Sequence, residues 1–495
     1  MTQATHSPDL SVLPRQRNLF YGGTWHTAKG QATWETFSPI DGTSLGLCAD
    51  ASDDDVDAAV QAAAKAFESW KRVPPLDRAK YLCQAAAVIR THGKELALID
   101  ALDCGNAIAP MMGDVETAAR QLEFFAGLVT EAKGETIPMG PERLNYTLRE
   151  PLGVVARIGA FNHPFMFSAG KAAAPLAAGN TVVVKPPEQA PLSTLRLAEL
   201  LQDVFPPGVF NVVTGQGKAT GQALVRHPLV AKVGLIGSVA AGRAVMRDAA
   251  ESLKPVLLEL GGKNALIGFP DADLPAMADA IVAGMNFAWC GQSCGSTSRV
   301  FLHEAIHDQV VPMVLERLAA FVAGRADNPS TTMGAIVSAE QHAQILKYIN
   351  LGLEEGATLA AGGKVPNDPE LAKGFYIQPT VFTHVTPAMR IAREEIFGPV
   401  LSIFSWKDES AMLQDVNSLD YGLTCSIFTQ DLATALRTAD NVQVGYVWVN
   451  EVGRHFLGAP YGGLKQSGNG REECFEELLA FTQLKNVHVR YPTNT

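Results

Sequence analysis

The sequence predicts an α/β protein whose parallel sheets are covered by helices on both faces. Between residues 143 and 260, short runs rich in β-branched residues alternate with helical runs of about three turns, which is typical of consecutive βαβ units. A second block of the same kind begins near Gly262. The composition, 47% hydrophobic and 18% charged over 495 residues, is that of a globular protein of roughly three domains.

The first helix is predicted to begin after Ser52, because a serine followed by three aspartates suits a helix N-terminus. Apolar residues then recur at helical spacing until the two prolines at positions 74 and 75. Further helices are predicted over 76–91 and 114–129, and residues 143–161 alternate polar and apolar side chains as strands do.

The regular alternation follows from residue 168. A helix over 168–178 is predicted to end at Gly179, and the helix that follows the next strand is predicted to start with a serine cap at Ser193. The predicted strands are 181–185, 210–214, 231–236 and 256–260, and the predicted helices between them are 193–204, 218–226 and 240–252. Ligands in such sheets bind at the carboxyl ends of the strands.

The second block carries predicted helices over 276–289 and 305–322 and strand-like segments at 299–302, 357–361, 400–404 and 446–450. The tail from Leu484 alternates polar and apolar residues like an exposed strand. We expect that strand to pair within the chain or with a second subunit.

Charge and cysteine content exclude several classes of protein. With 40 basic and 51 acidic residues the formal net charge is −11, which disfavours nucleic acid or an anionic membrane as partner. The seven cysteines are odd in number and offer neither a disulfide framework nor a zinc site, so we expect no metal. No secretory signal or long apolar run is visible, and we expect a soluble protein of the reducing cytoplasm.

Two segments could hold a nucleotide. Gly237 follows a predicted strand and opens a helix, where free backbone amides can hold a pyrophosphate, although a plain strand-to-helix turn explains it equally well. Lys185 and Glu188 lie just past the strand 181–185, where a carboxylate usually binds adenosine ribose hydroxyls and repels a 2′-phosphate. A solvated loop pair is the alternative interpretation.

A nucleophile and a base are also present. Cys294 lies in a turn rich in glycine, serine and threonine, where its sulfur can face a ligand, and it needs a base or dipole to form thiolate. Glu259 ends a buried strand, so desolvation is expected to raise its pKa toward the range of a general base. Taken singly, each residue is more often structural.

The joint occurrence of these segments, in order, resembles the aldehyde dehydrogenase superfamily from about residue 20 to 490. The matching segments are FNHPF, VVVKPPEQAP, GSVAAG, LLELGGK, GQSCGSTSR, EEIFGPV and YGGLKQSGNGRE. The resemblance implies an NAD-dependent, non-acylating enzyme. The Cys294 thiolate would attack the aldehyde to form a thiohemiacetal, and the Asn162 amide with the Cys294 backbone amide would hold the oxyanion. Loss of hydride to NAD would leave a thioester that Glu259 hydrolyses by activating water.

By the same resemblance, Lys185 and Glu188 would bind the adenosine ribose. The pyrophosphate would face Gly237 and Ser238, with Gly242 in the same segment. Glu395 and Phe397 would position the nicotinamide ribose and ring.

The family architecture implies a Rossmann-like NAD-binding domain over 1–129 and 150–261, an α/β catalytic domain over 262–476, and a small β oligomerisation arm from 130–149 and 477–495. Homodimers or homotetramers are implied.

The sequence departs from the family pattern near the aldehyde. Cys290, at a usually polar position, could shield or oxidise with Cys294, but packing is the favoured interpretation. Arg454 and His455 stand where many relatives have hydrophobic anchors, and with Phe167 they are predicted to line the aldehyde site. An arginine there would suit a carboxylate, although a surface arginine is the slightly favoured alternative. The motifs are similar to the 2-carboxybenzaldehyde dehydrogenase branch, and we hypothesise an aromatic or carboxylated aldehyde.

Other functions remain open at this point. An aliphatic, betaine-type or semialdehyde substrate is possible, as is a relative that passes the thioester to coenzyme A, although Glu259 favours hydrolysis. A catalytically silent protein with this fold would not need Cys294, Glu259 and Asn162. A cysteine–histidine hydrolase would need a histidine base, and no motif places one.

Overall fold

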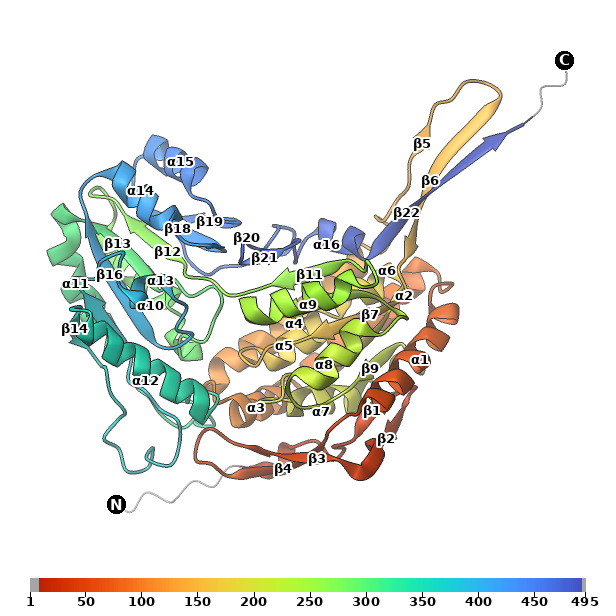
Figure 1. Ribbon diagram of the computed structural model, residues 1–495, viewed down its shortest axis with the longest axis horizontal. Coiled ribbons are helices and arrows are strands. Elements are labelled where there is room, and N and C mark those ends of the chain that lie inside the picture. The colour runs from red at the N-terminus through yellow and green to blue at the C-terminus, as the bar shows by residue number, and fades with distance from the viewer. Residues whose placement is uncertain (1–8, 492–495) are drawn as a thin grey trace.

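A computed structural model describes residues 9–491. The predicted domains begin at residue 1 and end at residue 495, so their residues 1–8 and 492–495 lie outside the described part of the chain. The strands form two large sheets, a separate three-stranded ribbon and two two-stranded sheets (Figure 1). This confirms the α/β class. No helix of the described residues is long and apolar enough to cross a bilayer.

The first sheet has eight strands in the order β2-β1-β9-β8-β7-β10-β11-β21. The five strands from β9 to β11 run parallel, and the chain order reverses between β7 and β10. Such a switch point leaves a crevice at the carboxyl ends of the strands. The strands are β1 Leu19–Tyr21, β2 Thr24–His26, β7 Val154–Ile158, β8 Thr181–Lys185, β9 Phe210–Val212, β10 Val230–Ile236, β11 Val256–Glu259 and β21 Gly468–Asn469.

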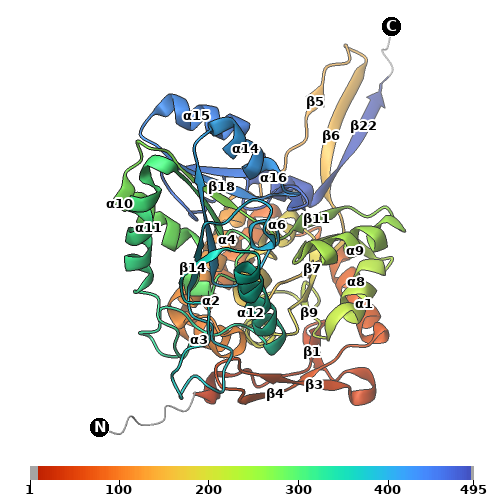
Figure 2. The ribbon, with the colours of Figure 1, turned by 60° about the vertical axis from the view of Figure 1, so that its left-hand side comes forward.

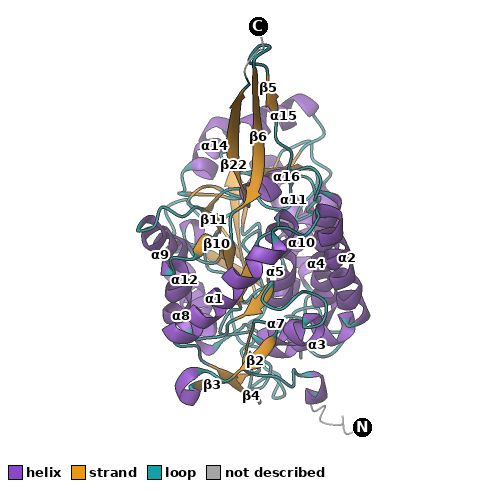
Figure 3. Ribbon diagram, turned by 90° about the vertical axis from the view of Figure 1, so that its right-hand side faces the viewer, coloured by secondary structure: helices purple, strands orange, loops and turns teal. Residues whose placement is uncertain are grey.

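Helices cover both faces of this sheet, with α8 and α9 on one side and α2 and α4 on the other (Figure 3). The first helix begins as predicted, since Ser52 caps it in a reciprocal capping box with Asp55. The helices are α1 Asp53–Trp70, α2 Pro75–Thr91, α3 Gly93–Cys104, α4 Ile108–Gly127, α5 Pro164–Gly170, α6 Ala173–Ala178, α7 Leu192–Leu201, α8 Gly217–Arg226 and α9 Val239–Ala250.

The second sheet has seven strands in the order β14-β15-β16-β13-β12-β18-β19, all parallel except β14. Its strands are β12 Ala265–Gly268, β13 Arg299–His303, β14 Thr358–Ala361, β15 Thr380–Thr383, β16 Val400–Trp406, β18 Thr424–Phe428 and β19 Tyr446–Val449. The helices of the C-terminal half are α10 Leu274–Gly284, α11 Glu304–Leu318, α12 Ala339–Glu354, α13 Arg390–Arg393, α14 Glu409–Asn417, α15 Leu432–Asn441 and α16 Phe475–Ala480.

The ribbon joins segments from both ends of the chain. β22 (Thr482–Arg490) pairs antiparallel with β6 (Arg143–Pro151), and β5 (Thr136–Ile137) pairs with the other edge of β6. The tail is therefore a strand that pairs within the chain, which confirms one of the two predicted alternatives. The ribbon projects away from both sheets (Figures 1 and 2), and the rest of the fold is completed by η1 Leu10–Val12, η2 Lys29–Gln31, η3 Phe287–Trp289, β3 Thr33–Phe37, β4 Ser44–Ala49, β17 Tyr421–Gly422 and β20 Leu464–Lys465.

Two local predictions are wrong. Ser193 does not cap a helix: α7 already begins at Leu192, and Ser193 lies inside its first turn, fully buried. The tertiary structure supplies the cap instead, because the Leu192 amide donates to the carboxylate of Asp103, 2.8 Å away on α3. The predicted helix over 168–178 is two short helices, α5 and α6, of which the second ends at Gly179 with φ 97°.

Candidate active site

Cys294 and Glu259 line one cavity of about 610 Å³. Glu259 is the last residue of β11, and Cys294 lies in the loop between η3 and β13. The two sheets thus each bring one reactive side chain to the space between them. Aromatic side chains form much of the remaining wall, namely Phe167, Trp289, Trp448, Phe456 and Tyr461.

Hydrogen bonds from Asn264, an asparagine that sequence analysis missed, anchor the loop that carries Cys294. The Asn264 side-chain amide donates to the carbonyl of Cys294 at 2.7 Å and to that of Ser296 at 3.0 Å. Its own oxygen accepts from the Thr424 amide. Buried asparagines with both ends bonded fix a loop firmly, so Asn264 sets the position of the sulfur. No motif marks it, since its partners lie 30 and 160 residues away.

Burial raises the pKa of the Cys294 thiol well above its usual value, and the adjacent Glu259 carboxyl raises it further. A hydrogen bond from the Tyr461 hydroxyl acts in the opposite direction by favouring thiolate. The resting group is therefore a thiol beside a carboxyl that can take its proton. Tyr461 also escaped sequence analysis, although it opens the YGGLKQSG segment.

Glu259 has the raised pKa that its buried strand predicts. Desolvation is the main cause and the charge of Glu472 the second, and together they raise the pKa to about 8. The side chain is 4% exposed, and its Oε1 has no hydrogen-bond partner among residues 9–491. A carboxyl in this state can exchange protons near neutral pH.

Behind Glu259 lies a buried ion cluster. Lys171 Nζ is 3.0 Å from Glu472 and 3.1 Å from Glu473, and Arg157 is 2.9 Å from Glu472. These four side chains are at most 8% exposed. The two cations hold the pKa values of Glu472 and Glu473 below the usual range despite the burial. No motif in the sequence indicates this cluster.

The residues assigned to the adenosine side of a cofactor lie together at the strand ends. Lys185 ends β8 with its ammonium bonded to the Pro186 carbonyl at 3.2 Å, and burial lowers its pKa. Glu188 accepts from the backbone amide of Gly217 at the start of α8. Gly221 lies one helical turn after Gly217, and a Cβ placed on it would lie 3.8 Å from the Lys185 side chain. The two segments therefore form one corner of the crevice.

The Gly237 turn joins β10 to α9, and Ser238 caps that helix by accepting from the Ala241 amide at 3.2 Å. A Cβ at Gly237 would meet no atom closer than 3.6 Å, so this stretch of backbone is open. Gly242 differs: a Cβ there would lie 2.5 Å from the Leu260 side chain. Glycine at 242 thus serves the close packing of α9 on the loop after β11.

Glu395 and Phe397 line a small cavity with Gly262, whereas Asn162 is not among the residues that line the cavity of Cys294 and Glu259. Glu395 Oε1 accepts from the Gly262 amide at 2.9 Å, and burial raises the pKa of its carboxyl. The Phe397 ring meets Phe161 edge-on, with centroids 5.6 Å apart. Asn162, beside Phe161, is 2% exposed, and its carbonyl accepts from the Asn106 amide.

The three residues predicted to contact the aldehyde all line the cavity. Phe167 is buried on α5, and the His455 ring contacts Tyr461 with centroids 4.2 Å apart and the ring planes tilted by 32°. Arg454 is 66% exposed, with a 3.6 Å ion pair to Glu451 and its guanidinium over the Phe456 ring. Cys290 does not reach the cavity: it is fully buried, and its thiol donates to the Ala335 carbonyl. Packing is therefore its role.

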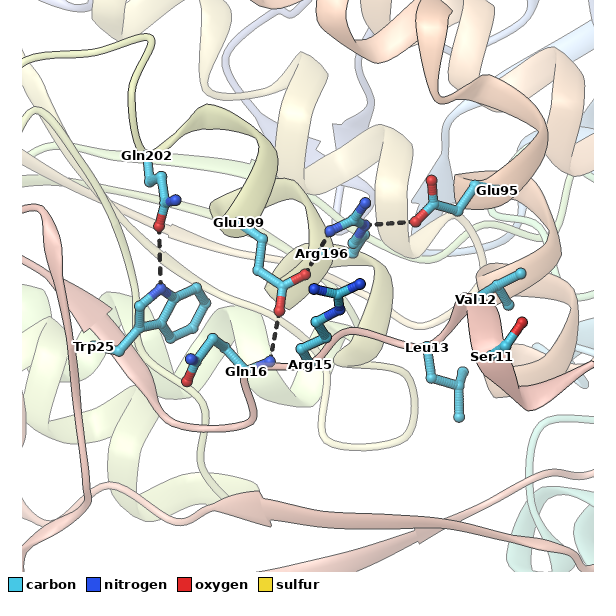
Figure 4. A pocket seen from close by; sticks show the side chains of 10 residues that line it. All are labelled: Ser11, Val12, Leu13, Arg15, Gln16, Trp25, Glu95, Arg196, Glu199 and Gln202. Carbon is cyan, nitrogen blue, oxygen red and sulfur yellow. Dashed lines mark hydrogen bonds and ion pairs between the residues drawn. The ribbon is translucent and has the colours of Figure 1, made fainter.

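A second cavity of about 460 Å³ lies on the N-terminal side of the molecule (Figure 4). Two arginines line it, Arg15 and Arg196; Arg196 forms ion pairs with Glu95 and Glu199, and Trp25 donates to Gln202. None of its lining residues is a cysteine or histidine. The reactive side chains thus gather in the larger cavity.

Comparisons with known proteins agree with this arrangement. The model of the aldehyde dehydrogenase family matches residues 25–487. Aldehyde dehydrogenase tropH of Talaromyces stipitatus is 53% identical over 490 residues, covering 97% of this chain and 95% of that protein. The NAD+ complex of an aldehyde dehydrogenase from Bacillus cereus is 37% identical, with TM-score 0.95, over 99% of this chain and 100% of that one. Indole-3-acetaldehyde dehydrogenase AldA of P. syringae, in a mutant bound to NAD+ and IAA, is 36% identical, with TM-score 0.95, over 97% and 98%.

Proposed function

Because the chain belongs to the aldehyde dehydrogenase family, we propose that it oxidises an aromatic aldehyde to the carboxylic acid with NAD as hydride acceptor. The observation that carries this proposal is the pairing of the Cys294 thiol with a protonatable Glu259 inside a cavity walled by aromatic rings. The solved relatives that bind NAD+ support the choice of cofactor.

Cys294 acts as the nucleophile. Its proton passes to Glu259, and its sulfur forms a bond to the aldehyde carbon, which gives a thiohemiacetal. The developing oxyanion is held by the Asn162 side-chain amide and the Cys294 backbone amide, an interaction commonly worth about 3–4 kcal/mol per donor. Tyr461 steadies the thiolate by its hydrogen bond.

The residues of the crevice fit a dinucleotide. Glu188 and Lys185 offer a carboxylate and an ammonium at the ribose position, the turn at Gly237 and Ser238 leaves room for a pyrophosphate, and Glu395 is held beside the glycines after Glu259 by its bond from the Gly262 amide. NAD held by these residues would supply the hydride acceptor, and the acyl group would then remain on Cys294 as a thioester. Glu259 first releases to solvent the proton that it took from Cys294. It then takes a proton from water, whose oxygen displaces the sulfur as thiolate and releases the acid.

The pH dependence of turnover follows from Glu259. Because the base form exists only above its pKa of about 8, kcat/KM is expected to rise about tenfold per pH unit below pH 8 and to level off above it. Glu259→Gln should lower kcat by about 10²- to 10⁴-fold and remove this rise. Initial rates of the natural enzyme and of Glu259→Gln between pH 6 and 10 measure the pH profile and the loss of kcat. An unchanged profile in Glu259→Gln would assign the base to another group.

The walls of the cavity favour a planar substrate. Phe167, Trp289 and Tyr461 offer ring faces and edges that an aromatic aldehyde can contact. A carboxylated aldehyde is the second candidate, because Arg454 lines the same cavity and its ion pair with Glu451, at 3.6 Å, is loose enough to exchange.

A panel of aldehydes tests the proposal. We expect NADH formation to be fastest with benzaldehydes, slower with aliphatic and amino aldehydes, slower with NADP because Glu188 repels the 2′-phosphate, and independent of coenzyme A. If a ring carboxylate is bound, Arg454→Ala should lower kcat/KM for carboxybenzaldehydes alone. A preference for aliphatic aldehydes would contradict the aromatic substrate, and dependence on coenzyme A would favour the acylating reaction.

Each sheet and the ribbon have separate roles in the proposed function. The eight-stranded sheet, in which β11 ends at Glu259, binds NAD. The seven-stranded sheet, whose strand β13 follows the Cys294 loop, carries the nucleophile. The ribbon of β5, β6 and β22 serves as the oligomerisation arm of a homodimer or homotetramer. The exposed outer face of β22 and its unpaired edge suit such a contact.

A further inference from the structure

Two histidines that line the aldehyde cavity are each paired with a carboxylate. His163 Nδ1 lies 2.8 Å from Asp114 Oδ2, and His455 Nδ1 lies 3.0 Å from Glu473 Oε2. Both pairs lie in the same cavity as Cys294. Neither pair takes part in the reaction steps above, so their placement there requires another explanation.

The His163–Asp114 pair is the more enclosed of the two. The His163 side chain is 14% exposed and that of Asp114 7%, whereas His455 is 37% exposed. His163 directly precedes α5, and Asp114 lies on the adjacent α4. The ring is fixed between Phe167 and Trp289, whose centroids are 5.3 and 5.7 Å away. The pair is a rigid part of the cavity wall.

The carboxylate determines which nitrogen of His163 is free. Because Nδ1–H donates to Asp114, Nε2 of the neutral ring is a hydrogen-bond acceptor. Among residues 9–491 no group donates to this Nε2. The wall therefore presents a strong acceptor between two aromatic surfaces.

We infer that the aldehyde taken by this cavity carries a ring hydroxyl, which donates its proton to His163 Nε2. This inference rests on the proposed function and narrows its substrate to hydroxylated aromatic aldehydes. Where the proton transfers fully, the O–H bond breaks, an N–H bond forms on Nε2, and Asp114 balances the imidazolium beside the resulting phenolate. An aldehyde in conjugation with the ring makes such a hydroxyl more acidic.

The chemistry of the wall disfavours the other ring substituents. A ring carboxylate brings no proton to donate to Nε2, and its charge would face that of Asp114, which lies behind the imidazole. A cationic substituent would find Glu473 already occupied by Lys171 and His455. A hydroxyl supplies the proton that this acceptor can bind.

Steady-state kinetics with benzaldehyde and its 2-, 3- and 4-hydroxy derivatives test the inference. The readout is the ratio of kcat/KM for the best hydroxybenzaldehyde to that for benzaldehyde, which we expect to be at least about tenfold in the natural enzyme. His163→Phe, which retains the ring contacts, should reduce this ratio to near one, and Asp114→Asn should reduce it partly. His92→Phe is the matched control, because His92 forms a similar pair with Glu95 outside the cavity.

Binding without turnover provides a second readout. In Cys294→Ala, bound 4-hydroxybenzaldehyde should shift its absorbance toward that of the phenolate, and the added His163→Phe change should abolish the shift. Equal kcat/KM for plain and hydroxylated rings, or a ratio that responds to His455→Phe but not to His163→Phe, would overturn the inference. Absence of NADH formation with every aldehyde would instead overturn the proposed function on which it rests.

Discussion

Cys294→Ala is expected to lower aldehyde-dependent NADH formation by at least about 10⁴-fold, because no sulfur remains to form the thiohemiacetal. Alanine fits the space of cysteine, and the carbonyl of residue 294 keeps its hydrogen bond from Asn264. The loop and the NAD site should therefore persist. Absorbance of the reduced cofactor, with tryptophan quenching as a measure of NAD binding, separates lost chemistry from lost binding.

Cys83→Ala provides the matched control. Cys83 is an exposed cysteine on α2, remote from the cavity lining, so its replacement should leave turnover unchanged. Equal activity of Cys294→Ala and the natural enzyme would refute the nucleophile assigned here. Loss of NAD binding along with activity would show instead that the loop itself had been disturbed.

Lys171→Met should destabilise the fold by about 3–5 kcal/mol, because it leaves two buried carboxylates without their shared cation. Lys171 contacts both Glu472 and Glu473, and the three side chains are at most 8% exposed. The loss should be fully present above about pH 4.5, the usual pKa of a glutamate, and should shrink as the pH falls below it, because Lys171 lowers the pKa values of both carboxyls in the folded protein. Unfolding by urea, followed by circular dichroism at several pH values, measures it.

A double-mutant comparison distinguishes charge from packing. Adding Glu473→Gln to Lys171→Met should recover part of the lost stability, since one uncompensated charge is removed. Lys133→Met is the surface control, because the Lys133–Glu131 pair is 67% and 43% exposed and should contribute less than about 1 kcal/mol. A loss no greater in Lys171→Met than in Lys133→Met would contradict the importance of the buried cluster.

The sequence by itself determined the features that depend on near neighbours along the chain. The Ser52 cap needs only Asp55, the strand 181–185 needs only its own run of β-branched residues, and Gly179 ends α6 because a positive φ favours glycine. Glu259 could be identified as a buried acid from the apolar strand that it ends. Cys294 could be identified from its small-residue turn and from the order of the motifs along the chain.

Only the tertiary structure decided the features that depend on residues far apart in sequence. Lys171 and Glu473 are 302 positions apart, and Arg157 and Glu472 are 315. The cap of α7 came from Asp103 on α3 and displaced the local serine. His163 and Asp114 became a pair because α4 packs on α5. A buried charge or donor takes whichever partner the packed elements bring to it, and periodicity along the chain carries no record of that partner.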